Sequence, residues 1–263
     1  WTSDKVVFSH HSSFYLSLFL PKVRRVYIVH DVLFIRARSK GFLRLHQRLI
    51  FQFEILLYNT AGSVLVLSLD DQRVLQKFCK SKIELISISS LMLNDVNPTL
   101  NEVAVVSDWR RNENLHGILS FFKSSKLSMF EFASELRITL YGFGSNRVAD
   151  AMSRLKVKNL RIIDKGSFVG ETEIVERFLL VPIIHGAGIK TKVLEALMSR
   201  RFVLGTKEAF IGLPFSKLSR AVRVVNDYSD LVELPCYPNE DDFLKISDNL
   251  RSSYCEIGFV LTN

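Results

Sequence analysis

The segment VPIIHGAGIKTKVLEAL, residues Val181–Leu197, combines the features that decide the fold class of this chain. Its first part is an apolar run, typical of a buried strand, that ends in Pro182. Two glycines, Gly186 and Gly188, follow, and then an amphipathic run with the periodicity of a helix. Strand, glycine-containing turn and helix, in this order, form the unit of α/β domains with parallel sheets. The segment therefore predicts an α/β domain.

Lys190 and Lys192 lie where this helix is expected to begin, near Ile189. The amino end of a helix has roughly half a positive charge, so each cation there is unfavourable by about 0.3–1 kcal/mol. In one interpretation a diphosphate binds the free N–H groups and both amines, and Glu195 accepts hydrogen bonds from ribose or sugar hydroxyls. In the other, the glycines form an ordinary turn, the lysines are solvated, and Lys192 pairs with Glu195 on the surface.

Strands and helices alternate along the rest of the chain. In the first part we expect strands in DKVVFSHH, RRVYIVHD, GSVLVLS and IELISIS, and helices in RLHQRLIFQFEILLYN and DDQRVLQKFC. The second helix is expected to have Asp70 or Asp71 near its cap. In the second part we expect strands in VAVVS, LRITLYGFGSN, NLRIID, LLVPIIH and FVLGT, and helices in NENLHGILSFFKSS, NRVADAMSRL, GETEIVERF and the Glu195 segment. The tail after FVLGT has a weaker pattern.

Two alternating series predict two Rossmann-like α/β lobes with parallel sheets. The polar segment 93–102, which contains Pro98, is the expected linker. We therefore divide the chain into an N-terminal, acceptor-side lobe of residues 1–97 and a C-terminal, nucleotide-sugar-binding lobe of residues 98–263. The first lobe is shorter than such a lobe usually is, so we expect it to be reduced or truncated.

Several segments together resemble one enzyme family. The pattern P-x-x-x-G-x-G-x-x-x-K-V-L-E-A, Pro182–Ala196, resembles the nucleotide-sugar loop of GT-B glycosyltransferases, most closely the retaining group called family 4. Further similarity, in the family's order, lies in RVYIVHD, VAVVSDWRRNENLHGILSFF, LRITLYGFGSN and DKGSFVGETEIVERFLLV. The resemblance extends roughly from Val26 to Leu213 and is best between Val103 and Thr206.

This resemblance implies a two-lobe enzyme that binds a nucleotide-diphosphate sugar in the cleft, mostly through the second lobe. It implies no metal and no cofactor, because lysine, arginine and a helix dipole neutralise the leaving diphosphate. The expected substrate contacts are Arg110, Arg111, His185, Gly186, Gly188, Lys190, Thr191, Lys192 and Glu195. The expected function is sugar transfer to a polysaccharide or lipid-linked acceptor in cell-surface glycan synthesis, with retention at the sugar.

His30 and Asp31 end a strand, at the edge where such folds bind ligands, and are the expected catalytic residues. His30 is expected to polarise the sugar's 6-hydroxyl or to position donor and acceptor, and Asp31 to fill a base-like role. The alternative is a His–Asp hydrogen bond that holds a loop. Arg110 or Arg111 is expected to fork to phosphate oxygens, and the alternative there is a solvated turn.

Two departures from the family pattern favour an alternative function. The family often has a second glutamate eight positions before Glu195, and here that position is Ala187, which leaves His185 as the neighbouring candidate. The glycine-rich loop expected early in the first lobe is not found. The alternative is therefore a non-catalytic GT-B protein that binds a nucleotide sugar or a partner subunit.

Composition limits the remaining classes. The net charge of +8 suits phosphates, nucleic acid or anionic lipid, but RNP-like aromatics and helix-turn-helix signals are missing, so we expect no nucleic-acid partner. Three scattered cysteines favour a reducing compartment over a disulfide framework or a zinc site. We find no apolar run of about 18 residues and no signal peptide, and we expect a cytoplasmic protein.

The stretch FIRARSKGFLRLHQRLIFQF, residues 34–53, mixes basic and apolar residues. Such a stretch either lies on an anionic bilayer or forms an ordinary helix with one core face and one wet face. The family resemblance favours the membrane, which would place the protein peripherally on the inner face of the plasma membrane.

Overall fold

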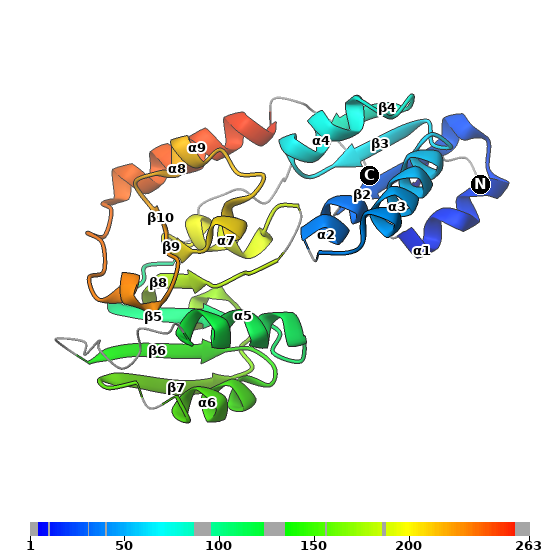
Figure 1. Cartoon of the computed structure of the whole chain (residues 1–263). Helices are drawn as coiled ribbons and strands as arrows, with labels where there is room; N and C mark the ends of the chain where they lie inside the picture. Colours follow the sequence, from blue (N-terminus) through cyan, green and yellow to red (C-terminus); the bar gives the residue numbers. More distant parts are fainter. Residues whose placement is uncertain are drawn as a thin grey trace.

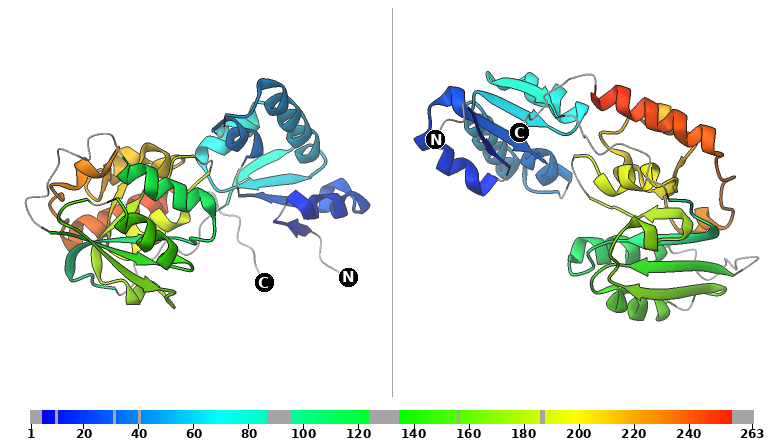
Figure 2. Two further views of the ribbon diagram at one scale, coloured as in Figure 1. Left: turned by 60° about the horizontal axis from the view of Figure 1, so that its bottom comes forward. Right: turned by 180° about the vertical axis from the view of Figure 1, so that it is seen from behind.

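The structure is a computed structural model that describes residues 5–9, 11–30, 32–39, 41–86, 96–123, 135–155, 157–185 and 188–255. These residues form two parallel β-sheets with helices packed on them, and the two halves lie side by side (Figures 1 and 2). The α/β class with two Rossmann-like lobes is confirmed.

The first lobe has a sheet of strand order β1-β2-β3-β4, in which all neighbouring strands are parallel. Its strands are β1 Val6–Phe8, β2 Arg25–Val29, β3 Ser63–Val66 and β4 Lys82–Leu85. All four residues of β3 are buried, as expected for a parallel strand covered on both faces. Phe14 and Tyr27 stack in this core with their ring centroids 4.2 Å apart.

The helices of this lobe are α1 His11–Phe14, η1 Tyr15–Phe19, η2 Lys22–Arg24, α2 Leu33–Ser39, α3 Arg44–Tyr58 and α4 Leu69–Gln76. The acidic residues expected near the cap of α4 are confirmed there. Ser68 caps this helix by accepting a hydrogen bond from the Asp71 N–H, and Asp70 and Asp71 lie in the first turn. A short serine hydroxyl reaches the free N–H groups of a first turn well, and the helix dipole favours acidic residues in that turn.

The second lobe has the strand order β10-β9-β8-β5-β6-β7, again with parallel neighbours. Its strands are β5 Leu100–Val106, β6 Leu136–Tyr141, β7 Leu160–Gly166, β8 Glu176–Val181, β9 Phe202–Gly205 and β10 Val222–Val224. Its helices are α5 Asn112–Phe122, α6 Ser145–Ser153, η3 Glu171–Glu173, α7 Thr191–Met198, η4 Lys207–Phe210, α8 Phe215–Leu218, η5 Tyr228–Leu231 and α9 Glu240–Cys255. The strand order reverses between β5 and β8. Doubly wound sheets bind ligands at this reversal, outside the carboxyl ends of the strands.

One local expectation in the second lobe was wrong. The segment GETEIVERF forms the single turn η3 and then enters β8, because Phe178 pairs with Val103 of β5 and is fully buried. The helix of the opening segment, expected to begin near Ile189, has Lys190 as its N-cap and Thr191 as its first residue. The tail contains α9, which packs against α7 and α8 and had no clear signal in the sequence.

The end of the expected linker lies in the second sheet, because the linker was placed at residues 93–102 and β5 starts at Leu100. Of segment 93–102, residues 93–95 lie outside the described residues, and Leu100 already begins β5. The boundary at residues 97 and 98 stays a prediction. The lobes contact each other, because a Cβ atom on Gly212 would lie 3.0 Å from Cβ of Ser68 and 3.1 Å from Cγ1 of Ile189.

Among the described residues we find no helix with the length and hydropathy that membrane crossing requires. In the same part of the chain, no group of three or more His, Cys, Asp or Glu side chains is placed to hold a metal ion.

Candidate functional site

A cavity of about 980 Å³ lies where the strand order of the second sheet reverses. Its walls include the carboxyl end of β5 with the residues that follow, the first turn of α5, the residues after β8 and the start of α7. The part of the first lobe that lines it is Phe42, in the turn between α2 and α3. The cavity therefore lies at the crevice that this topology predicts, with a wall from each lobe.

The start of α7 brings two amines to the cavity wall. Lys190 is the N-cap residue of α7 without a side-chain cap, and its Nζ donates to the Gly188 carbonyl at 2.9 Å. Nζ of Lys192 lies 3.1 Å from Oγ of Ser107 and 3.5 Å from the Val106 carbonyl oxygen, at the end of β5. Both lysines are only partly exposed. They face the cavity with polar contacts of their own, so they are not simply solvated side chains.

The pKa of the Lys192 amine is strongly perturbed. Burial, and then the charge of Lys190, lower the pKa of the Lys192 amine to about 8; Glu195 opposes this shift, and Arg111 adds a smaller lowering effect. Desolvation and neighbouring cations both disfavour the charged form of an amine. The cavity wall is therefore a place where an anion would be stabilised.

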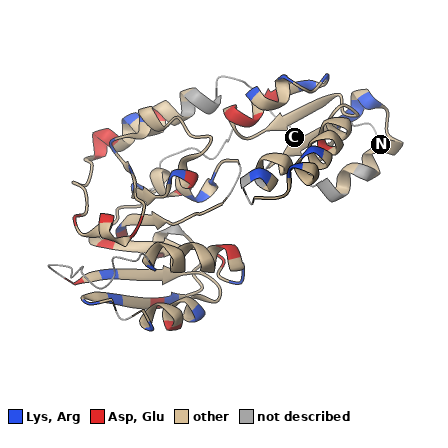
Figure 3. Cartoon of the chain, in the orientation of Figure 1, with Lys and Arg blue, Asp and Glu red and all other residues tan. Residues whose placement is uncertain are grey.

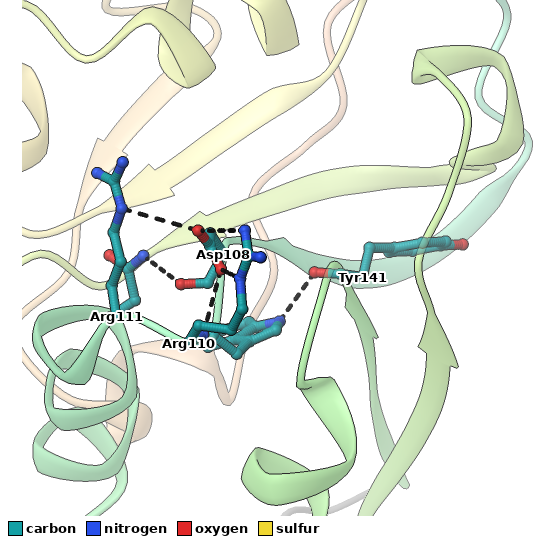
Figure 4. A network of polar contacts seen from close by, with 6 residues as sticks. Asp108, Arg110, Arg111 and Tyr141 are labelled. Atoms are coloured by element: carbon teal, nitrogen blue, oxygen red, sulfur yellow. Dashed lines mark hydrogen bonds and ion pairs between the residues drawn. The ribbon is translucent and has the colours of Figure 1, made fainter.

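A second group of charges surrounds Asp108 (Figure 4). Arg110 binds its carboxylate as a fork, with Nε–Oδ1 at 2.8 Å and Nη2–Oδ2 at 3.1 Å, and these hydrogen bonds hold the pKa of Asp108 below its ordinary value. The same guanidinium lies over the Phe143 ring, 4.9 Å from its centroid. Arg111 makes a looser contact, with Nε 3.8 Å from Oδ2 of Asp108. Arg111 is thus the better placed of the two arginines to bind an added anion.

Two glycines allow the walls of the cavity to approach each other. A Cβ atom on Gly117 in α5 would lie 2.4 Å from the carbonyl oxygen of Pro182 after β8. A Cβ atom on Gly142, at φ 116°, would lie 1.9 Å from the carbonyl oxygen of Ser107. Backbone atoms would have to move in both cases, so these glycines set the distance between the walls.

The helix α5 supplies further polar groups. Arg111 precedes its first residue, and Asn112, Asn114 and His116 line the cavity. The first N–H groups of a helix and its dipole favour an anion. The amino ends of α5 and α7 therefore both lie at one cavity that also contains basic side chains.

The structure gathers part of the expected site. The expected residues that line the cavity are Arg110, Arg111, His185, Lys190 and Lys192. Gly188 is buried and has φ 65°, a conformation that suits glycine.

Three of the remaining expected residues, Thr191, Glu195 and His30, are described by the structure and do not line the cavity. Thr191 and Glu195 are four residues apart on an exposed face of α7. His30 is exposed in the bend after β2. Gly186 and Asp31 lie outside the described residues. The roles expected for all of the site residues stay predictions.

Sequence reasoning missed several lining residues: Phe42, Ser107, Asn112, Asn114, His116 and Phe143. A signal was available for some of them. Gly117 directly follows His116 and interrupts a helix, and a glycine inside a helix often marks a close approach. Phe42 had no such signal, since its place in the cavity depends on how the lobes pack.

Comparison with known proteins was informative for structure only. No known protein-family profile matches the chain, and no curated protein of significantly similar sequence was found. Among solved structures, a TarM variant of S. aureus, in complex with fondaparinux, α-GlcNAc-glycerol and UDP, has a TM-score of 0.65 and 12% identity. The similarity covers 97% of this chain and 53% of that chain.

Sucrose-phosphate synthase of Thermosynechococcus elongatus has a TM-score of 0.66 and 10% identity over 95% of this chain and 69% of that chain. Anabaena HepE, in complex with UDP, has a TM-score of 0.57 and 13% identity, and the similarity covers 95% of this chain and 74% of that chain. The chain has the GT-B fold. It spans about half the length of the TarM chain, as the covered 53% indicates. Identities of this size show the GT-B fold and leave the activity of this chain to be proposed.

Proposed function

We propose that this GT-B chain transfers a sugar from a nucleotide-diphosphate donor to an acceptor hydroxyl. The observation that supports this most is the cavity at the β5–β8 reversal, whose wall combines Lys190, Lys192, Arg111 and the amino ends of α5 and α7. Basic side chains and helix amino ends together suit a diphosphate. Two of the solved GT-B neighbours are described as complexes with UDP, which agrees with such a donor.

In this proposal the second lobe holds the donor. Lys190, Lys192 and Arg111 bind the diphosphate, and Gly186 and Gly188 let the loop backbone approach it. Four further residues are proposed to contact the nucleotide-sugar donor: Arg110, His185, Thr191 and Glu195. Glu195 accepts hydrogen bonds from the ribose hydroxyls. Ser167 and Phe168, which follow β7 and line the cavity, are placed to contact the base.

The reaction requires stabilisation of the negative charge that develops on the leaving diphosphate. The bond between the anomeric carbon and the diphosphate oxygen breaks, the acceptor oxygen bonds to that carbon, and the acceptor proton passes to a base. Negative charge grows on the diphosphate, and the two lysines and Arg111 stabilise it. We infer that the transfer needs no metal or cofactor and retains the sugar configuration, with His30 beside the transferred sugar and Asp31 in the base-like role.

The acceptor is proposed to be a polysaccharide or a lipid-linked glycan of the cell surface. The support comes from α3, whose exposed side chains include Arg44, Leu45, Arg48, Leu49 and Leu56. Basic positions lie along this helix in Figure 3. Exposed leucines between arginines suit an anionic membrane surface, where each cation contributes about 1 kcal/mol.

A second candidate function is that of a GT-B protein that binds a nucleotide sugar without turning it over. The observation that favours it is the position of His30, which is exposed and does not line the cavity. A site that binds the donor but does not bring His30 to it would lack that expected catalytic contact.

Calorimetry with uridine and guanosine diphosphates tests the proposal. We expect at least one nucleotide to bind, and Lys190→Ala to weaken binding by about 1.5–3 kcal/mol, the range for hydrogen bonds to charged groups. Lys245→Ala, on the exposed face of α9, is the matched control and should bind normally. No nucleotide binding, or unchanged affinity in Lys190→Ala, would reject the donor site.

Incubation of the protein with the matching nucleotide sugars then separates the two candidates. Release of the nucleoside diphosphate, or transfer to added glycan, supports the enzyme. Tight binding without either reaction supports the non-catalytic GT-B protein.

A further inference from the structure

A buried acid in the first lobe has no part in the donor site described above. Glu54 of α3 is 0% exposed, in a helix segment with the apolar sequence FQFEILLY. Burial of a carboxylate is unfavourable unless hydrogen bonds or opposite charge compensate for it. The contacts of Glu54 should therefore show why an acid stands at this position.

These contacts bind Glu54 to the first residues of α2. Its Oε1 accepts from the Leu33 N–H at 2.6 Å, and its Oε2 accepts from the Phe34 N–H at 2.8 Å. Each carboxylate oxygen thus satisfies one N–H group that a helix start leaves without an intrahelical partner. The negative charge also lies at the positive end of the helix dipole.

A third contact fixes the carboxylate from its own helix. The Tyr58 hydroxyl donates to Oε1 of Glu54 at 2.8 Å. Burial, and then the Glu54 charge, raise the pKa of Tyr58, so the hydroxyl keeps its proton and remains a donor. The same two causes raise the pKa of Cys79 to about 11, so this thiol is uncharged at neutral pH. Tyr58 therefore adds a third donor to Glu54, while the two contacts with α2 come from backbone N–H groups.

The helix α2 joins two features of the proposed site. His30 lies just before it, in the bend after β2, and Phe42 lies just after it and lines the cavity. The Phe42 N–H donates to the Ala37 carbonyl at 3.1 Å, and Nε2 of Gln47 donates to the Phe42 carbonyl. A shift of α2 would thus move both His30 and the Phe42 wall of the cavity.

We propose that Glu54 is a positioning residue, which locks the start of α2 onto α3 and thereby sets His30 and Phe42 relative to the donor half of the cavity. The inference rests on the proposed glycosyl transfer for its effect on rate. Its effect on geometry does not depend on that function. Glu54 touches backbone N–H groups of α2 and acts on the reaction only through what α2 holds.

The test compares Glu54→Gln with the matched variant Tyr58→Phe. Glutamine offers one acceptor oxygen, so one α2 N–H group loses its partner, whereas Tyr58→Phe leaves both N–H contacts in place. Histidine ¹H–¹³C spectra report geometry without any activity, with the His30 signal assigned by His30→Ala. We expect Glu54→Gln to shift or broaden the His30 signal and to leave that of His116, in the second lobe, unchanged. In Tyr58→Phe the His30 signal should stay in place.

Kinetics give the second readout. With a nucleotide sugar that the protein uses, we expect Glu54→Gln to lower kcat about tenfold or more, with unchanged affinity for the nucleoside diphosphate. The further loss on adding Phe42→Ala should be smaller than in the wild-type background, because both changes disturb one wall. Tyr58→Phe should retain kcat within about threefold.

An unchanged His30 signal in folded Glu54→Gln overturns the proposal, and so does a kcat equal to the wild-type value. If Glu54→Gln does not fold, Glu54→Asp replaces it, because the shorter side chain cannot reach both N–H groups. If no nucleotide binds and no transfer occurs in any variant, the proposed function fails, and the His30 spectra still decide whether Glu54 sets this turn.

Discussion

The lowered pKa of the Lys192 amine indicates a site that favours an anion. Its amine is partly buried against Ser107 and Val106, and cations surround it, so its pKa falls to about 8. In the ligand-free protein the folded state thus binds fewer protons than the unfolded chain between about pH 8 and pH 10.5. Stability therefore rises with pH across this window as far as Lys192 is concerned.

Nucleotide binding should reverse this effect. A diphosphate beside Lys192 stabilises the protonated amine, so we expect affinity for a nucleoside diphosphate to fall about tenfold from pH 7.5 to pH 9. Calorimetry in two buffers of different ionisation enthalpy should also show proton uptake near pH 8. Lys192→Arg keeps its charge over this range, so its affinity should be nearly independent of pH. A flat profile in the wild-type protein would contradict the contact.

In the ligand-free structure Asp108 holds the Arg110 guanidinium in a forked ion pair and places a negative charge at the cavity. Asp108→Asn keeps the shape, removes the charge and releases the Arg110 fork. We therefore expect severalfold tighter binding of a nucleoside diphosphate, measured by calorimetry. Asp164→Asn, a change of the same chemistry at the end of β7, is the control and should have little effect on affinity. Weaker binding in Asp108→Asn would show that Asp108 assists the ligand.

Helix α5 depends on a glycine for its position. In Gly117→Ala the new methyl group would meet the Pro182 carbonyl oxygen at 2.4 Å, so α5 must move away from the end of β8. Overpacking of this kind lowers the free energy of unfolding by about 1–3 kcal/mol, which chemical denaturation measures. Gly170→Ala is the matched control, because a Cβ atom there meets no heavy atom within 4 Å. Equal stability of the two variants would contradict the close approach.

Helix α3 exposes apolar side chains away from the core. Leu45 and Leu49 are 66% and 55% exposed and lie one turn apart. We expect Leu45→Glu with Leu49→Glu to reduce sedimentation of the protein with phosphatidylglycerol vesicles, because acids oppose both apolar burial and the anionic surface. Leu244→Glu, at an exposed leucine of α9, should sediment like the wild-type protein. Equal sedimentation of all three proteins would remove the membrane surface from the proposal.

The two lobes meet at Gly212. This glycine has φ 81°, and a Cβ atom there would crowd Ser68 of the first lobe and Ile189 of the donor loop. In Gly212→Ala we expect a loss of unfolding free energy larger than in Gly41→Ala, which has φ 71° and meets nothing within 4 Å. Both variants include the strain of a left-handed alanine, roughly 1–2 kcal/mol, so their difference isolates the contact between lobes.

Affinity for the nucleotide is the second readout for this contact. Gly212→Ala should weaken nucleoside diphosphate binding, because Ile189 directly precedes Lys190 at the start of α7. Unchanged affinity together with a stability equal to that of Gly41→Ala would show that the contact between the lobes does not influence the donor loop.

The sequence by itself determined the fold class of the molecule and pointed to part of the cavity lining. Alternating apolar runs and helical periodicities predicted parallel sheets in two lobes, because these patterns depend on local burial. The position of Lys190 and Lys192 after the glycines predicted an anion site at the helix start, since helix dipole and charge act over a few residues. Both amines line the cavity.

Only the tertiary structure decided the rest. Phe178 is in a strand because it pairs with Val103 far along the chain, which overrides the helical pattern of its own segment. Phe42 and the second-lobe residues form one cavity, and Glu54 meets the start of α2, through packing between distant segments. Such contacts depend on how elements stack in space, and no local pattern of residues encodes that distance or orientation.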